Sequence, residues 1–340
     1  MENTNQPQSS FAKFFKKNRW SILIGAILLI STIYSYINNP TSTEAVLASM
    51  VRHATPLILG ALCGLIGERS GIINIGIEGQ MLMAAFLSFM VASSTGNLVL
   101  GVIVGLATGA LLGLLLAFMS VTLKVDQIIG GTVLNILAIG LTGYFYQVGA
   151  ASGGKFAPIP LGPLADIPLI GRVLFNNPPI TYVTLILVFV VHYVMFHTTW
   201  GLRTRAIGEH PRAADTVGVN VFVMRYVNTV IAGAIGGLAG AFLTMEAVGS
   251  FERAMTNGRG FVALAVMLFG QYTPFGALGA ALLFGFASAM QTQLQFAGTV
   301  DIPHQFIGMI PYVLTIAVLA GFVGRSRPPA AAGTIYEKEG

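Results

Sequence analysis

Hydrophobic residues run in long blocks along this 340-residue chain, and polar residues are concentrated between the blocks. A helix needs about 20 apolar residues to cross a membrane, and it satisfies its own backbone hydrogen bonds there. Ten blocks are candidate spans, at about 20–37, 46–66, 72–94, 98–122, 127–149, 180–198, 227–249, 259–271, 276–297 and 305–323. The pattern predicts an all-α, polytopic membrane bundle of about ten transmembrane helices.

The composition agrees with a membrane protein. Hydrophobic residues make up 54% of the chain and charged residues only 9%, whereas soluble domains carry about 25% charged residues. Cys63 is the only cysteine, so no disulfide can form within the chain. The first 19 residues are polar and then basic, and no convincing cleavage site follows them, so we expect a retained first span.

The basic residues between the blocks predict the orientation. Ten crossings place both termini on one side of the membrane, which we assign to the cytoplasm. Thirteen of the 18 lysines and arginines then lie inside, the bias typical of a cytoplasmic face. The five that would lie outside are Arg52, Lys155, Arg172, Arg253 and Arg259. The predicted organisation is a cytoplasmic tail at 1–19, a transmembrane domain at 20–323 and a cytoplasmic tail at 324–340.

Two connecting segments are unusually long. Residues 150–179 form an external loop with six prolines, which is typical of a stiff surface segment that could receive a partner. Residues 199–226 form an internal loop with four arginines. Within it, Pro211 suits the first position of a helix and Gly218 the position just beyond its end. We expect a short helix that another protein grips, in preference to an ordinary basic loop.

Glycines recur at helical spacing in two blocks, which predicts close helix packing. Gly101, Gly105, Gly109 and Gly113 lie in one block, and Gly233, Gly236, Gly237 and Gly240 lie in the other. Packing within one bundle is the favoured interpretation, and a seam between two subunits is the alternative.

A weak internal repeat also emerges. Spans two to five and seven to ten form two sets of four, and their odd offset would make the repeats inverted in the membrane. A glycine-broken stretch occurs near the start of each set, at 64–79 and at 249–260. Paired interruptions of this kind favour a substrate path at the centre of the bundle.

Four polar residues are candidates for that path. Asn74 and Glu78 would share one face if the segment after Gly71 is helical, and a carboxylate inside a membrane usually faces a cavity or a partner. We expect them to line or brace the path, with a structural hydrogen bond as the equal alternative. Gln291 and Gln295 lie on one helical face and could bind a neutral, hydroxyl-rich solute, although such residues also join helices.

No catalytic or metal-binding pattern is present in the sequence. The five histidines have no metal-ligand spacing, and no nucleophile constellation can be argued. The stretch GAASGGKF fits most of a phosphate-binding loop, but Phe156 stands where a magnesium ligand is required, and no strand precedes it. The chain is therefore expected to be no enzyme, to hydrolyse no ATP itself, and to bind no metal, cofactor or nucleic acid.

Two stretches resemble a known family. GERSGIINIGIEGQMLMAAF (67–86) and GLRTRAIGEHPRAADTVGVNV (201–221) are similar to permease subunits of bacterial ABC importers of the branched-chain amino acid, ribose and simple-sugar class, and most similar to nucleoside-type permeases. A third stretch, 258–285, is similar to the later helices of the family. The resemblance implies that the second stretch docks an ATPase. By position, the residues that carry this coupling are Arg205, Gly208, Glu209, Pro211, Ala213, Ala214 and Gly218.

The resemblance also implies the partners and the location. We expect ABC ATPase subunits that bind ATP and magnesium, a second permease that could be a related but different chain, and an extracytoplasmic solute-binding lipoprotein. The chain would cross the bacterial cytoplasmic membrane, in contact with its lipid, and carry a nucleoside. A simple sugar is the alternative cargo, and a stand-alone secondary transporter or channel is the alternative class.

Overall fold

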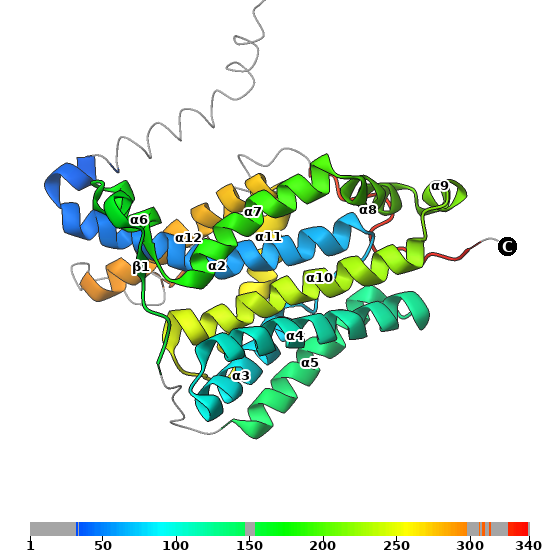
Figure 1. Ribbon diagram of the computed structural model, residues 1–340, viewed down its shortest axis with the longest axis horizontal. Coiled ribbons are helices and arrows are strands. Elements are labelled where there is room, and N and C mark those ends of the chain that lie inside the picture. The colour runs from blue at the N-terminus through cyan, green and yellow to red at the C-terminus, as the bar shows by residue number, and fades with distance from the viewer. Residues whose placement is uncertain are drawn as a thin grey trace, which may run out of the picture.

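The computed structural model describes residues 32, 34–146, 154–297, 306, 308, 309, 313 and 326–338. The expected first span and the tail at 1–19 lie almost wholly outside these residues, and so does most of the expected span at 305–323. The part of the chain that is described is mostly helical (Figure 1).

Within the described residues, ten α-helices and two π-helical turns form the bundle. They are α2 (Pro40–Arg69), α3 (Ile77–Thr95), α4 (Leu98–Ala117) with η1 (Phe118–Thr122), α5 (Gln127–Phe145), α7 (Pro179–His197), α8 (Thr199–Glu209), α9 (Pro211–Thr216), α10 (Val221–Phe242) with η3 (Leu243–Val248), α11 (Arg259–Phe269) and α12 (Pro274–Ala297). The predicted external loop folds into β1 (Ile159–Pro160), η2 (Gly162–Asp166), α6 (Ile170–Leu174) and β2 (Asn176–Asn177), and β1 pairs antiparallel with β2.

The sequence marks where many of the helices begin. Proline occupies the first position of several helices, where its missing N–H has no intrahelical partner to lose. Side chains that accept hydrogen bonds from free backbone N–H groups precede others: Asn97 before α4, Asp126 before α5 and Asn220 before α10. These caps and prolines divide the apolar blocks into separate helices.

The bundle has two distinct ends, with α2 running through its centre between them (Figure 1). At one end, Arg172 of α6 pairs with Glu44 of α2 at 3.1 Å. At the other end, the backbone oxygen of Arg69 lies against Gly208 of α8. We call these the α6 end and the α9 end. The 30 residues of α2 span about 45 Å at 1.5 Å per residue, so α2 exceeds the thickness of a hydrocarbon core.

Five of the periodic glycines, Gly105, Gly109, Gly113, Gly233 and Gly237, join α4 to α10 within this one chain. A Cβ added to Gly109 would lie 2.2 Å from the oxygen of Gly233, and one added to Gly237 would lie 2.2 Å from the oxygen of Gly105. Only glycine permits the two backbones to approach so closely. Packing within one bundle is therefore confirmed as the role of this seam.

Seven helices in the described part of the chain are long and apolar enough to cross a membrane. They confirm a polytopic, all-α membrane protein, whereas the expected number of about ten spans is not established. The block at 259–271 forms α11, which has only 11 residues, or about half a membrane thickness. The side chains that α4, α5 and α7 leave exposed are mostly apolar, as expected of helices that contact lipid or another subunit.

Candidate functional site

The two glycine-broken stretches of the sequence meet inside the bundle. The first break separates α2 from α3, and the second separates η3 from α11. Glu78, in the first turn of α3, accepts hydrogen bonds from the backbone N–H groups of Gly258 at 2.8 Å and Gly260 at 2.6 Å. The α11 helix begins at that point, so the carboxylate accepts hydrogen bonds from N–H groups that have no partner within the helix. It also interacts favourably with the positive end of the helix dipole. Glu78 thus braces the junction of the two breaks.

Close approach of backbones fixes this junction. A Cβ on Gly260 would lie 2.5 Å from the nitrogen of Glu78. On the other side of the first break, Gly79 donates its N–H to Asn135 of α5 at 2.7 Å, and the Asn135 amide donates to the oxygen of Ile75. Non-helical backbone is tolerated at membrane depth only when protein groups satisfy it, and α5 supplies those groups here.

Asn74 does not share a helix with Glu78. Residues 72–74 are non-helical, and α3 begins only at Ile77, so the expectation of a common helical face was wrong. The glycines at 71 and 76 allow the break, since Gly71 has a φ of +90° that other residues rarely adopt. Asn74 is instead fully buried, and its amide donates to Gln80 at 3.0 Å and to the Cys63 sulfur at 3.6 Å.

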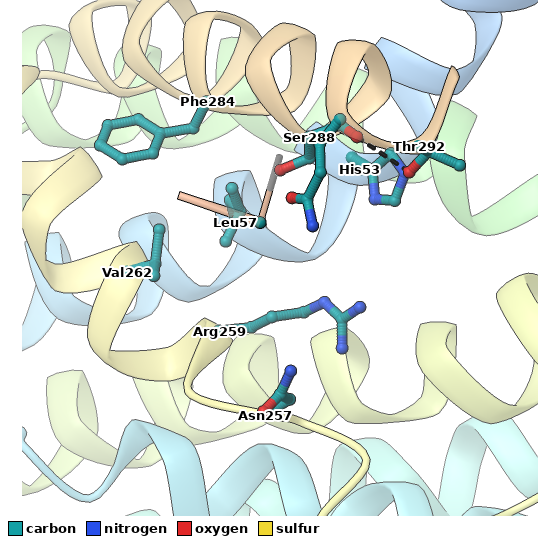
Figure 2. Close-up of a pocket in the computed structure, with 10 residues that line it drawn as sticks. His53, Leu57, Asn257, Arg259, Val262, Phe284, Ser288 and Thr292 are labelled. Atoms are coloured by element: carbon teal, nitrogen blue, oxygen red, sulfur yellow. Dashed lines mark hydrogen bonds between the residues drawn. The ribbon is translucent and has the colours of Figure 1, made fainter. Parts of the chain in front are cut away.

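A cavity of about 330 Å³ lies beside the start of α11. Figure 2 shows Arg259 and Asn257 on one side of it, facing His53 of α2 and Ser288 and Thr292 of α12 on the other. Leu57, Val262 and Phe284 add apolar surface, and Gln291 completes the polar lining. Its volume and its mixture of polar and apolar walls are typical of sites for small molecules.

The structure separates the two predicted glutamines. Gln291 lines the cavity, whereas Gln295, one turn farther along α12, is exposed and is no part of the lining. The sequence analysis did not identify His53, Asn257, Arg259 and Thr292 as candidates. Arg259 was expected in an external loop, and the structure places it at the first position of α11, where its guanidinium donates to the oxygen of Met255 at 2.8 Å. The glycine-broken stretch at 249–260, which contains Asn257 and Arg259, was the sequence signal that could have identified these two residues.

A second deep carboxylate also caps a helix. Glu246 of η3 accepts the N–H of Ile180 at 2.7 Å and of Thr181 at 3.1 Å, and it binds the Thr181 hydroxyl. These residues form the first turn of α7, at the α6 end of the bundle. Glu78 and Glu246 therefore have the same local role at the starts of two different helices.

The predicted short helix is present at the α9 end. Helix α9 begins at Pro211 and ends before Gly218, whose φ is +85°. Ala213 is exposed, while Ala214 is buried in a small apolar cluster with Ile207 and Val221. The preceding helix α8 is anchored, because Gly208 abuts the backbone of Arg69 and Arg205 stacks over Phe196 with 5.0 Å between guanidinium carbon and ring centre.

The described residues contain no group of three or more histidine, cysteine, aspartate or glutamate side chains that could hold a metal ion. The polar groups that line the cavity are amides, hydroxyls, an imidazole and a guanidinium. Such groups bind and orient a solute by hydrogen bonds.

Comparison with known proteins identifies relatives over almost the whole chain. Residues 46–319 match the family described as branched-chain amino acid transport system permease component. The guanosine ABC transporter permease protein NupQ of Bacillus subtilis is 39% identical over 84% of this chain and 94% of its own length. The nucleoside ABC transporter permease protein NupC of Lactococcus lactis is 36% identical over 88% and 99%. A putative glucose ABC transporter permease protein of Haloferax volcanii, TsgC13, is 35% identical over 86% and 97%.

Proposed function

The chain belongs to the branched-chain amino acid transport system permease family, and we therefore propose that it is the membrane-spanning subunit of an ATP-binding-cassette importer for nucleosides. The observation that carries the proposal is the identity of 39% and 36% to two permeases named for guanosine and nucleosides, over nearly their full lengths. The chain is a transport component and no enzyme, and separate ATPase subunits bind ATP and magnesium and hydrolyse the nucleotide.

The α9 end is the proposed docking site of the ATPase. Helix α9 projects from the bundle with Ala213 exposed, and α8 connects it to the end of α2 through Gly208. A force on α9 would therefore reach the break between α2 and α3 directly. We assign Pro211, Ala213, Ala214 and Gly218 to the coupling helix, and Arg205, Gly208 and Glu209 to the segment that leads into it.

The cavity beside α11 is the proposed resting place of the cargo on its path. Hydroxyl, amide and guanidinium groups can hydrogen-bond to a ribose and to the polar edge of a base, and the apolar side chains can lie against its ring. Gln291 contacts the solute in this proposal. Asn74 and Glu78 brace the wall, and Gln295 lies along the same helix face farther from the α9 end.

Orientation and partners follow from the two ends. We assign the α9 end to the cytoplasm, and the C-terminal segment 326–338 lies at that end (Figure 1). The N-terminus is proposed on the same side by way of the expected first span, which lies outside the described residues. The proline-rich segment at 154–178 faces outside and receives a solute-binding lipoprotein. A second permease, related to this chain, completes the path, and apolar faces of the outer helices contact it or the lipid of the bacterial inner membrane.

A stand-alone, ion-coupled transporter is disfavoured by the two deep carboxylates. Proton or ion coupling needs an acidic group that can exchange its partner during transport. Glu78 and Glu246 both have their oxygens engaged by backbone N–H groups at helix starts. Because both carboxylates cap helices, they are poor candidates for ion coupling. An ATPase that acts on the α9 end is the better candidate for driving transport.

The decisive experiment is uptake by the purified complex in lipid vesicles. Radiolabelled guanosine, adenosine, uridine and glucose should be compared, with ATP and with or without the ATPase subunits. Accumulation of nucleosides only with the ATPase supports the proposal. Uptake by this chain alone would contradict the importer class, and accumulation of glucose in place of nucleosides would assign the sugar that the Haloferax relative suggests.

A further inference from the structure

The C-terminal segment 326–338 lies across the α9 end of the bundle and is hydrogen-bonded to it. Ala331 donates its backbone N–H to the oxygen of Gly208 at 2.8 Å, and Gly333 donates its N–H to the oxygen of Gly71 at 3.2 Å. Ala330 donates to the carboxylate of Glu209 at 3.2 Å. We call this segment the strap. It ties α8 to the loop between α2 and α3, two elements that are far apart in the sequence.

Two buried side chains hold the strap in place. Tyr336 is 6% exposed and packs against Phe222 with ring centres 5.3 Å apart, inside the apolar cluster that contains Ala214 of α9. Arg225 of α10 is 1% exposed and donates to the oxygen of Thr334 at 3.0 Å. Burial of Tyr336 from the strap, and of the α10 guanidinium that binds the strap backbone, indicates an ordered element and not a free tail.

The strap and α9 enclose a groove at the tip of the molecule. The groove has a volume of about 670 Å³. One wall is His210 with Pro211, Arg212 and Ala213 of α9, and the other is Ala330, Ala331 and Thr334–Glu337 of the strap. Ile335 is 47% exposed at its edge. The outer surface is also charged, because Lys338 pairs with Asp215 of α9 at 3.9 Å and Glu337 pairs with Lys124.

We propose that the docking surface for the ATPase is composite: the ATPase inserts into the groove and grips the strap as well as α9. This inference rests on the proposed function. The groove is continuous with the exposed face of α9, so a partner that holds Pro211 and Ala213 necessarily meets the opposite wall. Because the strap also binds Gly71, the ATPase pulls on the break between α2 and α3 by two routes, through α8 and through the strap.

The test is retention of the ATPase by the detergent-solubilised complex. Ile335→Glu places a charge in the groove without disturbing the buried Tyr336. It should lower the affinity for the ATPase roughly tenfold, because a charge buried at an interface without a partner is strongly unfavourable. Leu164→Glu in η2 is the matched control, since Leu164 is 48% exposed but lies in the segment that folds at the α6 end. It should retain the ATPase.

A photo-cross-linking residue tests the same contact without relying on weakened binding. Placed at position 335 it should form an adduct with the ATPase, and placed at 164 it should not. The inference is overturned if Ile335→Glu retains the ATPase fully and position 335 forms no adduct, while Ala213→Glu loses the ATPase. That result leaves the proposed function intact. If the unaltered chain retains no ATPase, the proposed function itself fails.

Discussion

The Glu78 carboxylate accepts the backbone N–H of Gly260 at 2.6 Å, joining two residues that are 182 positions apart in the sequence. The same carboxylate binds Gly258, so one side chain closes the start of α11. Residues 257 and 259, on either side of Gly258, line the central cavity. The position of the cavity wall therefore depends on a single charged cap.

Replacing Glu78 with glutamine should impair transport more than expression. The amide keeps the size of the side chain but loses the charge and one acceptor, and hydrogen bonds to charged groups contribute about 1.5–3 kcal/mol. The start of α11 should loosen, and nucleoside uptake per assembled complex should fall. Uptake and expression measured together check this prediction.

Glu246→Gln is the matched control for Glu78→Gln. It removes the same kind of cap from α7, at the α6 end and away from the cavity. The two variants should lower thermal stability to similar extents, but Glu246→Gln should affect uptake less. Wild-type uptake by Glu78→Gln would show that the cap does not shape the path.

The sequence predicted which helices form better than it predicted how they pack against one another. Apolar blocks, prolines and capping residues located the long helices, and Pro211 with Gly218 located α9. The paired glycine interruptions indicated the centre of the bundle. Hydrophobic periodicity cannot reveal that α11 begins against the first turn of α3, because this depends on tertiary contacts such as Glu78 with Gly260. For that reason the sequence did not identify Arg259 as part of the cavity wall.

The candidate site shows the same limit. Gln291 and Gln295 share a helical face in the sequence, but only Gln291 reaches the cavity, since the position of the cavity is set by the other helices. Asn74 was expected on a helix because its neighbours are apolar. The glycines on either side of it permit a non-helical backbone, and two hydrogen bonds with α5 stabilise that conformation: Ile73 donates its N–H to Gln127, and Asn135 donates to the oxygen of Ile75.

The glycine seam predicts a sharp difference between two similar substitutions. Gly109→Ala would bring its Cβ to 2.2 Å from the oxygen of Gly233, so α4 and α10 must separate, at a cost of about 1–3 kcal/mol or more. Gly140→Ala on α5 meets no described atom within 4 Å and should be neutral or slightly stabilising, because alanine favours a helix. Thermal unfolding of the solubilised protein measures both, and equal melting temperatures would contradict the tight seam.

Glu209→Lys should weaken docking of the ATPase while the bundle still folds. Glu209 is exposed next to α9, and its carboxylate accepts the N–H of Ala330. Lysine reverses the charge and removes the acceptor, whereas Glu209→Gln keeps an acceptor and serves as the control. Co-purification of the ATPase should fall for lysine and change little for glutamine. Unchanged co-purification with lysine would remove Glu209 from the coupling segment.

Gln291 and Gln295 should differ in their effect on transport. Gln291→Ala removes a polar group from the cavity wall, and the loss of one hydrogen bond, about 0.5–1.5 kcal/mol, corresponds to roughly a 2- to 12-fold loss of affinity for the solute. Gln295→Ala alters an exposed residue of the same helix and should leave uptake near that of the unaltered protein. The concentration dependence of nucleoside uptake measures this difference, with ATPase retention as a check on assembly. An equal loss in both variants would place the solute along the outer part of α12, and no loss in either would remove Gln291 from the path.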